Sequence, residues 1–369
     1  MMPSKKPIDT RLPVTLVTGF LGAGKTTVLN RLLASPDGER IAVIVNEFGE
    51  AGLDHDLIEA VDEEIVLMQS GCLCCSVRGD LSRVIGDLLK RRAAGTLEFT
   101  RVVIETTGLA DPGPILQTFL VDPDLAQNVR MDGVVTVADA ATGQGTLDRH
   151  FEAVSQIAMA DLVILSKADL VTTEAAALFE ARIAGLNPAA QILRAERGKV
   201  PQGSLWGLSA LRLGARPEDA RAWLSRSQPV ADPLANLSGL TRRKESKPQP
   251  SPHDARIGSA SIVLEKPVPD VVFDLWLESL VALRGPDILR IKGIVHIEGL
   301  PKPYVFHGVQ HVFDPPVPVE DWPGDDTQSR IMVIARDITR QELQQSLDIL
   351  RSRLPLAAEF ETKEEGPMP

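Results

Sequence analysis

The chain has 369 residues, of which 44% are apolar and 24% charged, a composition typical of a globular protein with about two domains. Its 50 acidic residues outnumber its 39 Lys and Arg residues, and the formal charge of -11 argues against nucleic acid or an anionic membrane surface as a partner. No apolar run is long enough to cross a bilayer, and the N-terminus lacks an apolar segment of secretory type. We therefore expect a cytoplasmic protein.

Short runs rich in Val and Ile alternate with amphipathic segments over the first part of the chain. The runs are apolar throughout, as in strands buried on both faces, and they lie at 14–17, 41–45, 101–104, 134–137 and 162–165. Amphipathic segments at Thr27–Leu33 and from Asp80 onward predict helices between them. This order predicts parallel βαβ units, and we assign residues 13–224 to an α/β domain with a mostly parallel sheet.

The sequence VTGFLGAGKTT connects the first predicted strand to the first predicted helix. It matches the G-x-x-x-x-G-K-[ST] pattern of a P-loop, in which backbone N–H groups and a helix N-terminus bind phosphates. Lys25 is expected to contact the β- and γ-phosphates, and the Thr26 hydroxyl is expected to bind Mg²⁺. The first domain is therefore predicted to be a P-loop NTPase. The nucleotide-binding residues expected in this loop are Gly19, Gly22, Ala23, Gly24, Lys25, Thr26 and Thr27.

The sequence RVVIETTGLADPGP places Glu105 at the end of a predicted strand. We expect Glu105 to order the shell of Mg²⁺ through water, and Thr107 and Gly108 to begin a loop that senses the γ-phosphate. The alternative for Glu105 is a capping or solvated side chain at the strand end. Asp111 and Pro112 are expected to open the next helix rather than to take part in chemistry.

The sequence LVILSKAD ends a later strand with Ser166, Lys167 and Asp169, a variant of the N/T-K-x-D element that reads guanine. An ionised Asp169 only accepts hydrogen bonds, so it suits the N1–H and amino donors of guanine and disfavours the N1 acceptor of adenine. The Lys167 stem is expected to pack on the ring. An exposed Lys and a helix-capping Asp are also common after a strand, which is the alternative. Together with the P-loop, the element favours GTP and GDP.

All three cysteines of the chain lie in the sequence GCLCC, at Cys72, Cys74 and Cys75. An odd number of thiols in a reducing compartment argues against a disulfide framework and favours metal ligation, since thiolates are preferred ligands of Zn²⁺ and Cu(I). A helix expected just after Asp80, together with Arg78, would lower the thiol pKa values. Three thiolates leave a tetrahedral shell one ligand short. Thiol redox or sulfur transfer, and small buried core residues, are the alternatives.

Candidates for a further ligand lie in the sequence VNEFGEAGLDHD. Glu47 follows a predicted strand and is therefore expected at the same sheet edge as the P-loop. Glu50, Asp54 and His55 lie in the loop beyond, and His55 is interpreted as a solvated residue.

The composition changes between residues 225 and 258, where Pro, Ser and charged residues replace the periodic pattern and predict a linker. Further strand-like and helical segments predict a smaller C-terminal α+β domain over residues 259–356. Residues 1–12 are assigned to an N-terminal tail and residues 357–369 to a disordered tail.

Three histidines of the second domain, His296, His307 and His311, are candidates for contact with a metal or a client. The sequence HGVQH is interpreted as a strand or a strand end, where residues four apart share a face. Partly buried or edge-strand histidines are the simpler interpretation.

These motifs together resemble the CobW-like GTPases, relatives of the hydrogenase and urease nickel-insertion GTPases. The resemblance rests on GFLGAGKTT, NEFGE, GCLCC, ETTGLADP, DGVVTVADA and SKAD, and in the second domain on RIKGIVHIEG and VFHGVQH. It spans the chain from Val14 to about Arg336 without the linker, and C-x-C-C is its most specific mark. Many members carry a His-rich linker, whereas this one contains only His253.

The resemblance implies a GTPase that handles a transition metal, commonly zinc, and delivers it to zinc-requiring client proteins. It also implies that Glu47, in a switch region near the cysteine loop, is the first candidate for the accessory zinc ligand, with a role at the Mg²⁺ waters or the phosphate as the alternative. No arginine finger or catalytic Gln can be assigned, so we expect slow hydrolysis that is stimulated by metal, by a client or by homodimer formation. The alternative functions are cobalt handling, for cobalamin synthesis or nitrile hydratase, and a non-catalytic zinc buffer or regulator.

Overall fold

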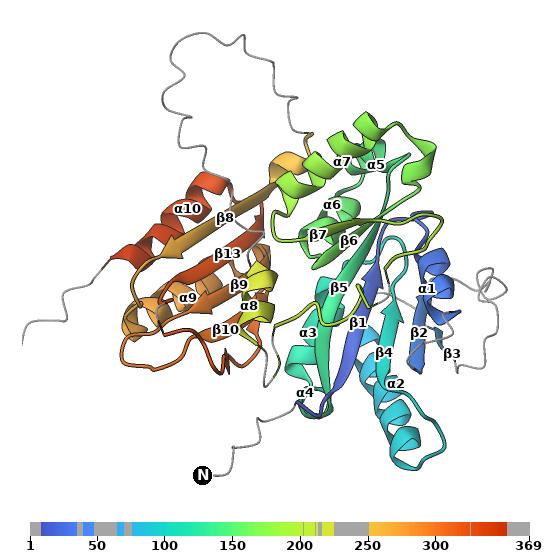
Figure 1. The fold of residues 1–369 in the computed structure, drawn as a ribbon, viewed down its shortest axis with the longest axis horizontal. Coiled ribbons are helices and arrows are strands. Elements are labelled where there is room, and N and C mark those ends of the chain that lie inside the picture. The colour runs from blue at the N-terminus through green and yellow to red at the C-terminus, as the bar shows by residue number, and fades with distance from the viewer. Residues whose placement is uncertain are drawn as a thin grey trace, which may run out of the picture.

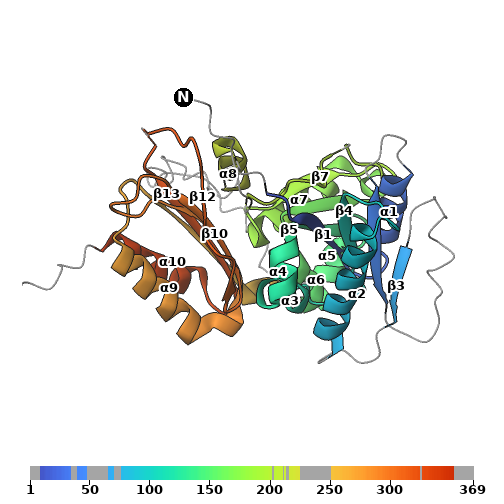
Figure 2. The ribbon, with the colours of Figure 1, turned by 90° about the horizontal axis from the view of Figure 1, so that it is seen from below.

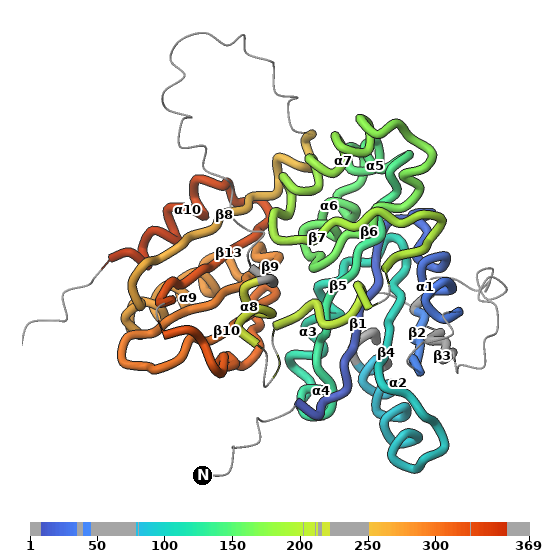
Figure 3. Tube along the Cα trace, in the orientation of Figure 1, coloured from blue at the N-terminus to red at the C-terminus, as the bar shows by residue number. Residues whose placement is uncertain are grey.

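The computed structural model describes residues 9–34, 40–47, 65–69, 76–201, 203–210, 212, 216–224, 251–324 and 326–352. They form two domains, each built on one sheet (Figure 1). The chain runs through the parallel sheet first and then enters the antiparallel one, as the trace in Figure 3 shows. Within this part of the chain, no helix is both long and apolar enough to span a bilayer.

The first sheet is parallel throughout and has seven strands in the order β3-β2-β4-β1-β5-β6-β7. The prediction of an α/β domain is thereby confirmed, and each of the predicted runs lies within a strand. The strands are β1 (Leu12–Thr18), β2 (Ile41–Glu47), β3 (Ile65–Gln69), β4 (Arg101–Glu105), β5 (Val129–Asp139), β6 (Leu162–Ser166) and β7 (Gln191–Arg194).

Helices cover both faces of this sheet, which explains why its strands are apolar throughout. Val14 and Leu16 of β1 belong to an apolar cluster with residues of the helices on one face, whereas Val17 packs with α1 on the other. The helices of this domain are α1 (Lys25–Leu33), α2 (Ser76–Ala93), α3 (Gly113–Val121), α4 (Pro123–Asn128), α5 (Gly143–Arg149), α6 (Phe151–Ala158) and α7 (Thr173–Leu186). The next helix, α8 (Pro217–Leu224), packs against the second sheet, where Ala220 joins a cluster with Ile294 and Val305.

Two features of the first domain differ from the sequence-based expectation. Helix α2 begins at Ser76, directly after Cys75, rather than after Asp80. Strands β3 and β7 were not predicted, because β3 follows an acidic stretch and β7 is only four residues long and half-exposed at the sheet edge.

The second domain consists of an antiparallel sheet with two helices on one face, which confirms the predicted α+β class. Ile331 and Val333 of β13 pack against the helices, while Met332 and Ile334 point to the opposite face and join the core of the first domain. Figure 2 shows α9 and α10 on the far side of this sheet from the first domain. The elements are β8 (Ile257–Leu264), α9 (Asp270–Arg284), β9 (Ile288–Val295), β10 (Tyr304–Val309), β11 (Val312–Phe313), β12 (Val317–Pro318), β13 (Ser329–Arg336) and α10 (Arg340–Asp348).

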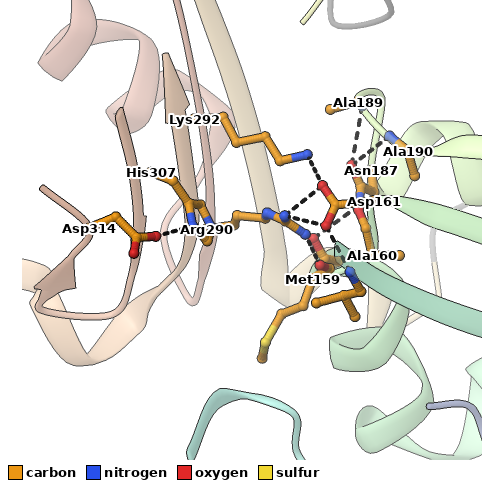
Figure 4. A network of polar contacts seen from close by, with 12 residues as sticks. Met159, Ala160, Asp161, Asn187, Ala189, Ala190, Arg290, Lys292, His307 and Asp314 are labelled. Carbon is orange, nitrogen blue, oxygen red and sulfur yellow. Dashed lines mark hydrogen bonds and ion pairs between the residues drawn. The ribbon is translucent and has the colours of Figure 1, made fainter. Parts of the chain in front are cut away.

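A buried ionic network joins the two domains (Figure 4). Both Asp161 carboxylate oxygens lie 2.6 Å from Arg290 Nη2, and Lys292 Nζ donates to Asp161 Oδ1 at 2.5 Å. Burial alone would raise the pKa of Asp161, but the charges of Arg290 and Lys292 outweigh it and hold that pKa well below its ordinary value. Burial and the charge of Arg290 lower the pKa of Lys292 to about 8, although Asp161 opposes the shift.

Candidate functional site

Polar residues gather where the parallel strands of the first sheet end, at their carboxyl edge. Glu105 ends β4, Asp139 ends β5 and Ser166 ends β6, while the P-loop follows β1. Open parallel sheets bind ligands at this edge, because the loops that follow the strands converge there. The structure therefore brings together three segments that the sequence analysis assigned separately to the phosphates, the metal ion and the base.

The P-loop has the tight backbone that its glycines permit. Gly19 has φ +141°, and a Cβ atom added there would lie 2.3 Å from the carbonyl oxygen of Val137. Gly24 has φ +95° and is the N-cap of α1. Lys25 begins that helix, and its Nζ donates to the carbonyl oxygens of Gly19 at 3.0 Å and Phe20 at 3.4 Å. Its ammonium group thus lies across the loop that is expected to wrap the phosphates.

The end of β4 contacts the P-loop directly. Thr26 Oγ1 donates to Glu105 Oε1 at 2.9 Å, so the two predicted magnesium-shell residues lie side by side although they are far apart in the sequence. Gly108 lies so close to the P-loop that an added Cβ would be 2.6 Å from the backbone nitrogen of Leu21. Thr107 lies between Glu105 and Gly108 in the sequence. Its hydroxyl is buried and has no hydrogen-bond partner among the described residues.

The segment after Gly108 has the capping role that was expected. Asp111 Oδ1 accepts a hydrogen bond from the backbone N–H of Gly113, and Pro112 is the N-cap of α3.

The predicted base-reading segment is hydrogen-bonded to the P-loop. Ser166 Oγ donates to the carbonyl oxygen of Ala23 at 2.6 Å, so its hydroxyl bonds to the P-loop backbone. Lys167 adopts φ 54°, and its Nζ donates to the carbonyl oxygen of Gly22 at 2.8 Å and to Asp139 Oδ2 at 2.7 Å. Asp169 lies in the short 3-10 helix Ala168–Leu170 with an exposed side chain.

Sequence reasoning missed Asp139, which anchors Lys167. Burial alone would raise the pKa of Asp139, but hydrogen bonds from Lys167 and from the backbone N–H of Ala141 hold it below its ordinary value. Asp139 therefore stays ionised and fixes the Lys167 ammonium group beside the P-loop. The available signal was a carboxylate at the end of a buried strand, in the sequence DGVVTVADA.

A second missed segment is the turn after β7. An added Cβ at Gly198 would lie 2.9 Å from Thr27 Cγ2, and the turn is closed by hydrogen bonds between Glu196 and Lys199. This turn therefore lies against the first turns of α1, and it follows β7, which pairs with β6. Nothing in its local sequence indicated that contact.

The predicted metal ligands Cys72, Cys74 and Cys75 lie outside the described residues, as do Glu50, Asp54 and His55. The backbone of Glu47 ends β2 and pairs with Gln69 at the end of β3. Among the described residues, no three His, Cys, Asp or Glu side chains form a group that could hold a metal ion.

The sequence HGVQH contains the end of a strand, as expected, but His307 and His311 do not share a strand face because β10 ends at Val309. His307 lies in β10 and is buried, with Nδ1 3.2 Å from Asp314 Oδ2, whereas His311 lies in the two-residue turn between β10 and β11 and is exposed. Gln310 in this turn has φ 57°, and the chain reverses there to form a hairpin between β10 and β11. His296 is buried and has an edge contact with Trp322.

Comparison with known proteins agrees with this architecture. Residues 13–194 match the family model "CobW/HypB/UreG, nucleotide-binding domain", and residues 257–351 match "Cobalamin synthesis protein cobW C-terminal domain". The chain is 33% identical to zinc chaperone YjiA of Escherichia coli, over 92% of this chain and 99% of that protein. It is 34% identical to zinc chaperone CobW of Pseudomonas aeruginosa, over 91% of each chain.

A solved structure extends the likeness to three dimensions. The crystal structure of Zn(II)-bound YjiA GTPase from E. coli superposes with a TM-score of 0.67 at 27% identity, covering 93% of this chain and 99% of that one. The P-loop geometry, the two-domain order and the similarity over nearly the full length lead to one assignment: the chain belongs to the CobW family, with a CobW/HypB/UreG nucleotide-binding domain followed by a CobW C-terminal domain.

Proposed function

We propose that this protein binds and hydrolyses GTP and uses the nucleotide cycle to bind zinc and release it to client proteins. The observation that carries the GTPase proposal is the Thr26–Glu105 contact of 2.9 Å, beside a Lys25 ammonium group that spans the P-loop. The names of the relatives support the zinc part, since two are zinc chaperones.

The oxygen donors of Thr26 and Glu105 fit a magnesium ion, which prefers oxygen ligands. They would hold Mg²⁺, directly for Thr26 and through water for Glu105, and the ion supplies charge neutralisation at the phosphates. Lys25 would exchange its bonds to the loop carbonyls for bonds to the β- and γ-phosphates. The buried Thr107 hydroxyl would gain a partner when the γ-phosphate and its attacking water are bound. Hydrolysis then proceeds by in-line attack of water on the γ-phosphate.

Guanine is the base that the chemistry of the β6 loop supports. Lys167 is fixed by Asp139 and the carbonyl oxygen of Gly22, so its stem is pre-organised to cover a purine ring. The exposed Asp169 carboxylate can accept from the two guanine donors, and the turn at Gly198 would line the same base.

Replacing Gly108 with alanine should lower the rate of GTP hydrolysis roughly 100-fold, because the added methyl group forces the γ-phosphate loop away from Leu21. The control is Gly86→Ala in α2, where an added Cβ meets nothing within 4 Å. Phosphate release under multiple turnover measures both variants. Equal rates for Gly108→Ala and the wild type would refute close packing of this loop as a requirement for hydrolysis.

The zinc site is proposed at Cys72, Cys74 and Cys75, with Glu47 as the accessory ligand. Two described features support it. The backbone of Glu47 is paired with Gln69, three residues before Cys72, and α2 begins directly after Cys75. A helix N-terminus favours anions, so it would lower the thiol pKa values and favour the thiolates that bind zinc.

A competitive zinc titration of the reduced protein against a chromogenic chelator tests this proposal. It is run with Mg²⁺ and either GDP or a non-hydrolysable GTP analogue. We expect one tight site that disappears when the three cysteines are replaced by serine, and a zinc affinity that differs between the two nucleotides because a ligand shifts only the states it distinguishes. Tight binding with equal affinity in both states would favour a zinc buffer. No tight zinc site in either state would indicate another metal, such as cobalt, or thiol chemistry.

A further inference from the structure

A fully buried glutamine outside the phosphate-binding motifs holds the γ-phosphate loop. Gln156 lies in α6 with no exposed surface, and its Nε2 donates to the carbonyl oxygens of Gly108 at 3.2 Å and Ala110 at 3.0 Å. A primary amide has two N–H donors, so one side chain serves both carbonyl groups. These bonds are buried, where losing a partner costs about 1–3 kcal/mol for each unsatisfied group.

The loop is therefore held on two sides. On one side Gly108 packs against the backbone of Leu21 in the P-loop, and on the other side both carbonyl groups bond to Gln156. At the start of the loop, the N–H of Thr106 donates to the carbonyl oxygen of Val17 in β1. The orientation of Thr107 and Gly108 depends on these contacts rather than on the loop sequence alone.

Helix α6 is itself a rigid support, because its C-terminal end is fixed. Asn187 Nδ2 donates to the carbonyl oxygens of Ile157 at 2.8 Å, Ala158 at 3.1 Å and Ala160 at 2.9 Å. Arg290 of the second domain donates to the carbonyl oxygen of Met159, the C-cap of α6 (Figure 4). A guanidinium group at this position also interacts favourably with the helix dipole.

We propose that Gln156 is a positioning residue for GTP hydrolysis, an inference that rests on the function proposed above. Its amide keeps Thr107 and Gly108 in the orientation in which they face the γ-phosphate, and α6 transmits the rigidity of the domain interface to that loop. Gln156 does not touch the nucleotide. Its loss should therefore change the catalytic rate and leave the affinity for GDP nearly unchanged, because the P-loop contacts of Lys25 and Lys167 do not involve it.

The test is Gln156→Met, which keeps the length of the side chain and removes both N–H donors of the amide. We expect kcat for GTP hydrolysis to fall roughly 10- to 100-fold, with the affinity for GDP within about threefold of the wild type. The matched control is Thr136→Val, because Thr136 Oγ1 donates to the main-chain oxygen of Gln156 at 2.8 Å. That variant removes a buried hydrogen bond at the same residue without touching the amide, so its kcat should stay near that of the wild type.

Hydrogen–deuterium exchange of the nucleotide-free protein gives a second readout that does not require hydrolysis. Exchange of the backbone amides at 106–111 should increase in Gln156→Met and not in Thr136→Val. Equal losses of kcat in the two variants, or unchanged exchange in Gln156→Met, would overturn the positioning role. A wild-type protein that does not hydrolyse GTP would refute the proposed function, while the exchange experiment would still decide whether Gln156 holds the loop.

Discussion

Lys25→Ala is expected to reduce GTP hydrolysis to background, a loss of roughly 10³-fold or more, because the variant removes the one P-loop cation that neutralises charge on the β- and γ-phosphates. Lys25 is 9% exposed, and its Nζ bonds to two loop carbonyls, so the ammonium group is already desolvated and held at the loop. Multiple-turnover phosphate release at saturating GTP and Mg²⁺ measures the effect.

Two further variants separate the role of this ammonium group from a general loss of positive charge. Lys266→Ala removes an exposed lysine from the second domain and should leave the rate unchanged. Lys25→Arg keeps the charge but replaces a compact ammonium group with a larger, planar guanidinium group. We therefore expect at most partial GTPase activity. Full hydrolysis by Lys25→Ala would remove the basis for the proposed mechanism.

Asp161→Asn should lower the free energy of unfolding by about 3–5 kcal/mol, the range observed when one charged partner of a buried ion pair is removed. The substitution keeps the shape of the side chain but leaves Arg290 and Lys292 buried without the carboxylate between them. Urea denaturation at pH 7 measures the loss. The control is Asp148→Asn, since Asp148 also pairs with an arginine, Arg182, at 2.7 Å but is half-exposed, and it should cost at most about 1 kcal/mol.

The same carboxylate gives the stability a defined dependence on pH. The folded-state pKa of Asp161 lies below its unfolded value, so its contribution is present above about pH 4 and is lost as the pH falls below that value towards the folded-state pKa. The Asp161→Asn variant should therefore lose less stability than the wild type between pH 5 and pH 3.

In the urea experiment at pH 7, equal stability losses for Asp161→Asn and Asp148→Asn would show that the network contributes no more than a surface pair.

The parts of this protein that sequence could predict depend on residues that are neighbours in the chain. The P-loop is one contiguous motif, and the buried strands are recognisable because both of their faces are apolar. The capping role of Asp111 and Pro112 is likewise local, and the structure has it as expected.

Other features depend on contacts between distant segments, which no local pattern records. Gln156 reaches Gly108 across 48 positions of the chain, and Arg290 reaches Asp161 across 129. The hairpin turn at Gln310 was not predicted for another reason, because a positive φ is uncommon in a non-glycine residue and Gln does not indicate it.

One apolar cluster contains residues of both domains, including Leu12 and Leu116 from the first and Leu289, Val309 and Ile334 from the second. The domains are therefore joined by buried apolar contacts as well as by the peptide connection. A protease cut in that connection would leave a two-chain complex, and each piece would expose apolar surface on separation. The C-terminal domain is consequently not an interchangeable module. Recombination could transfer it to another nucleotide-binding domain only together with the surface on which it packs.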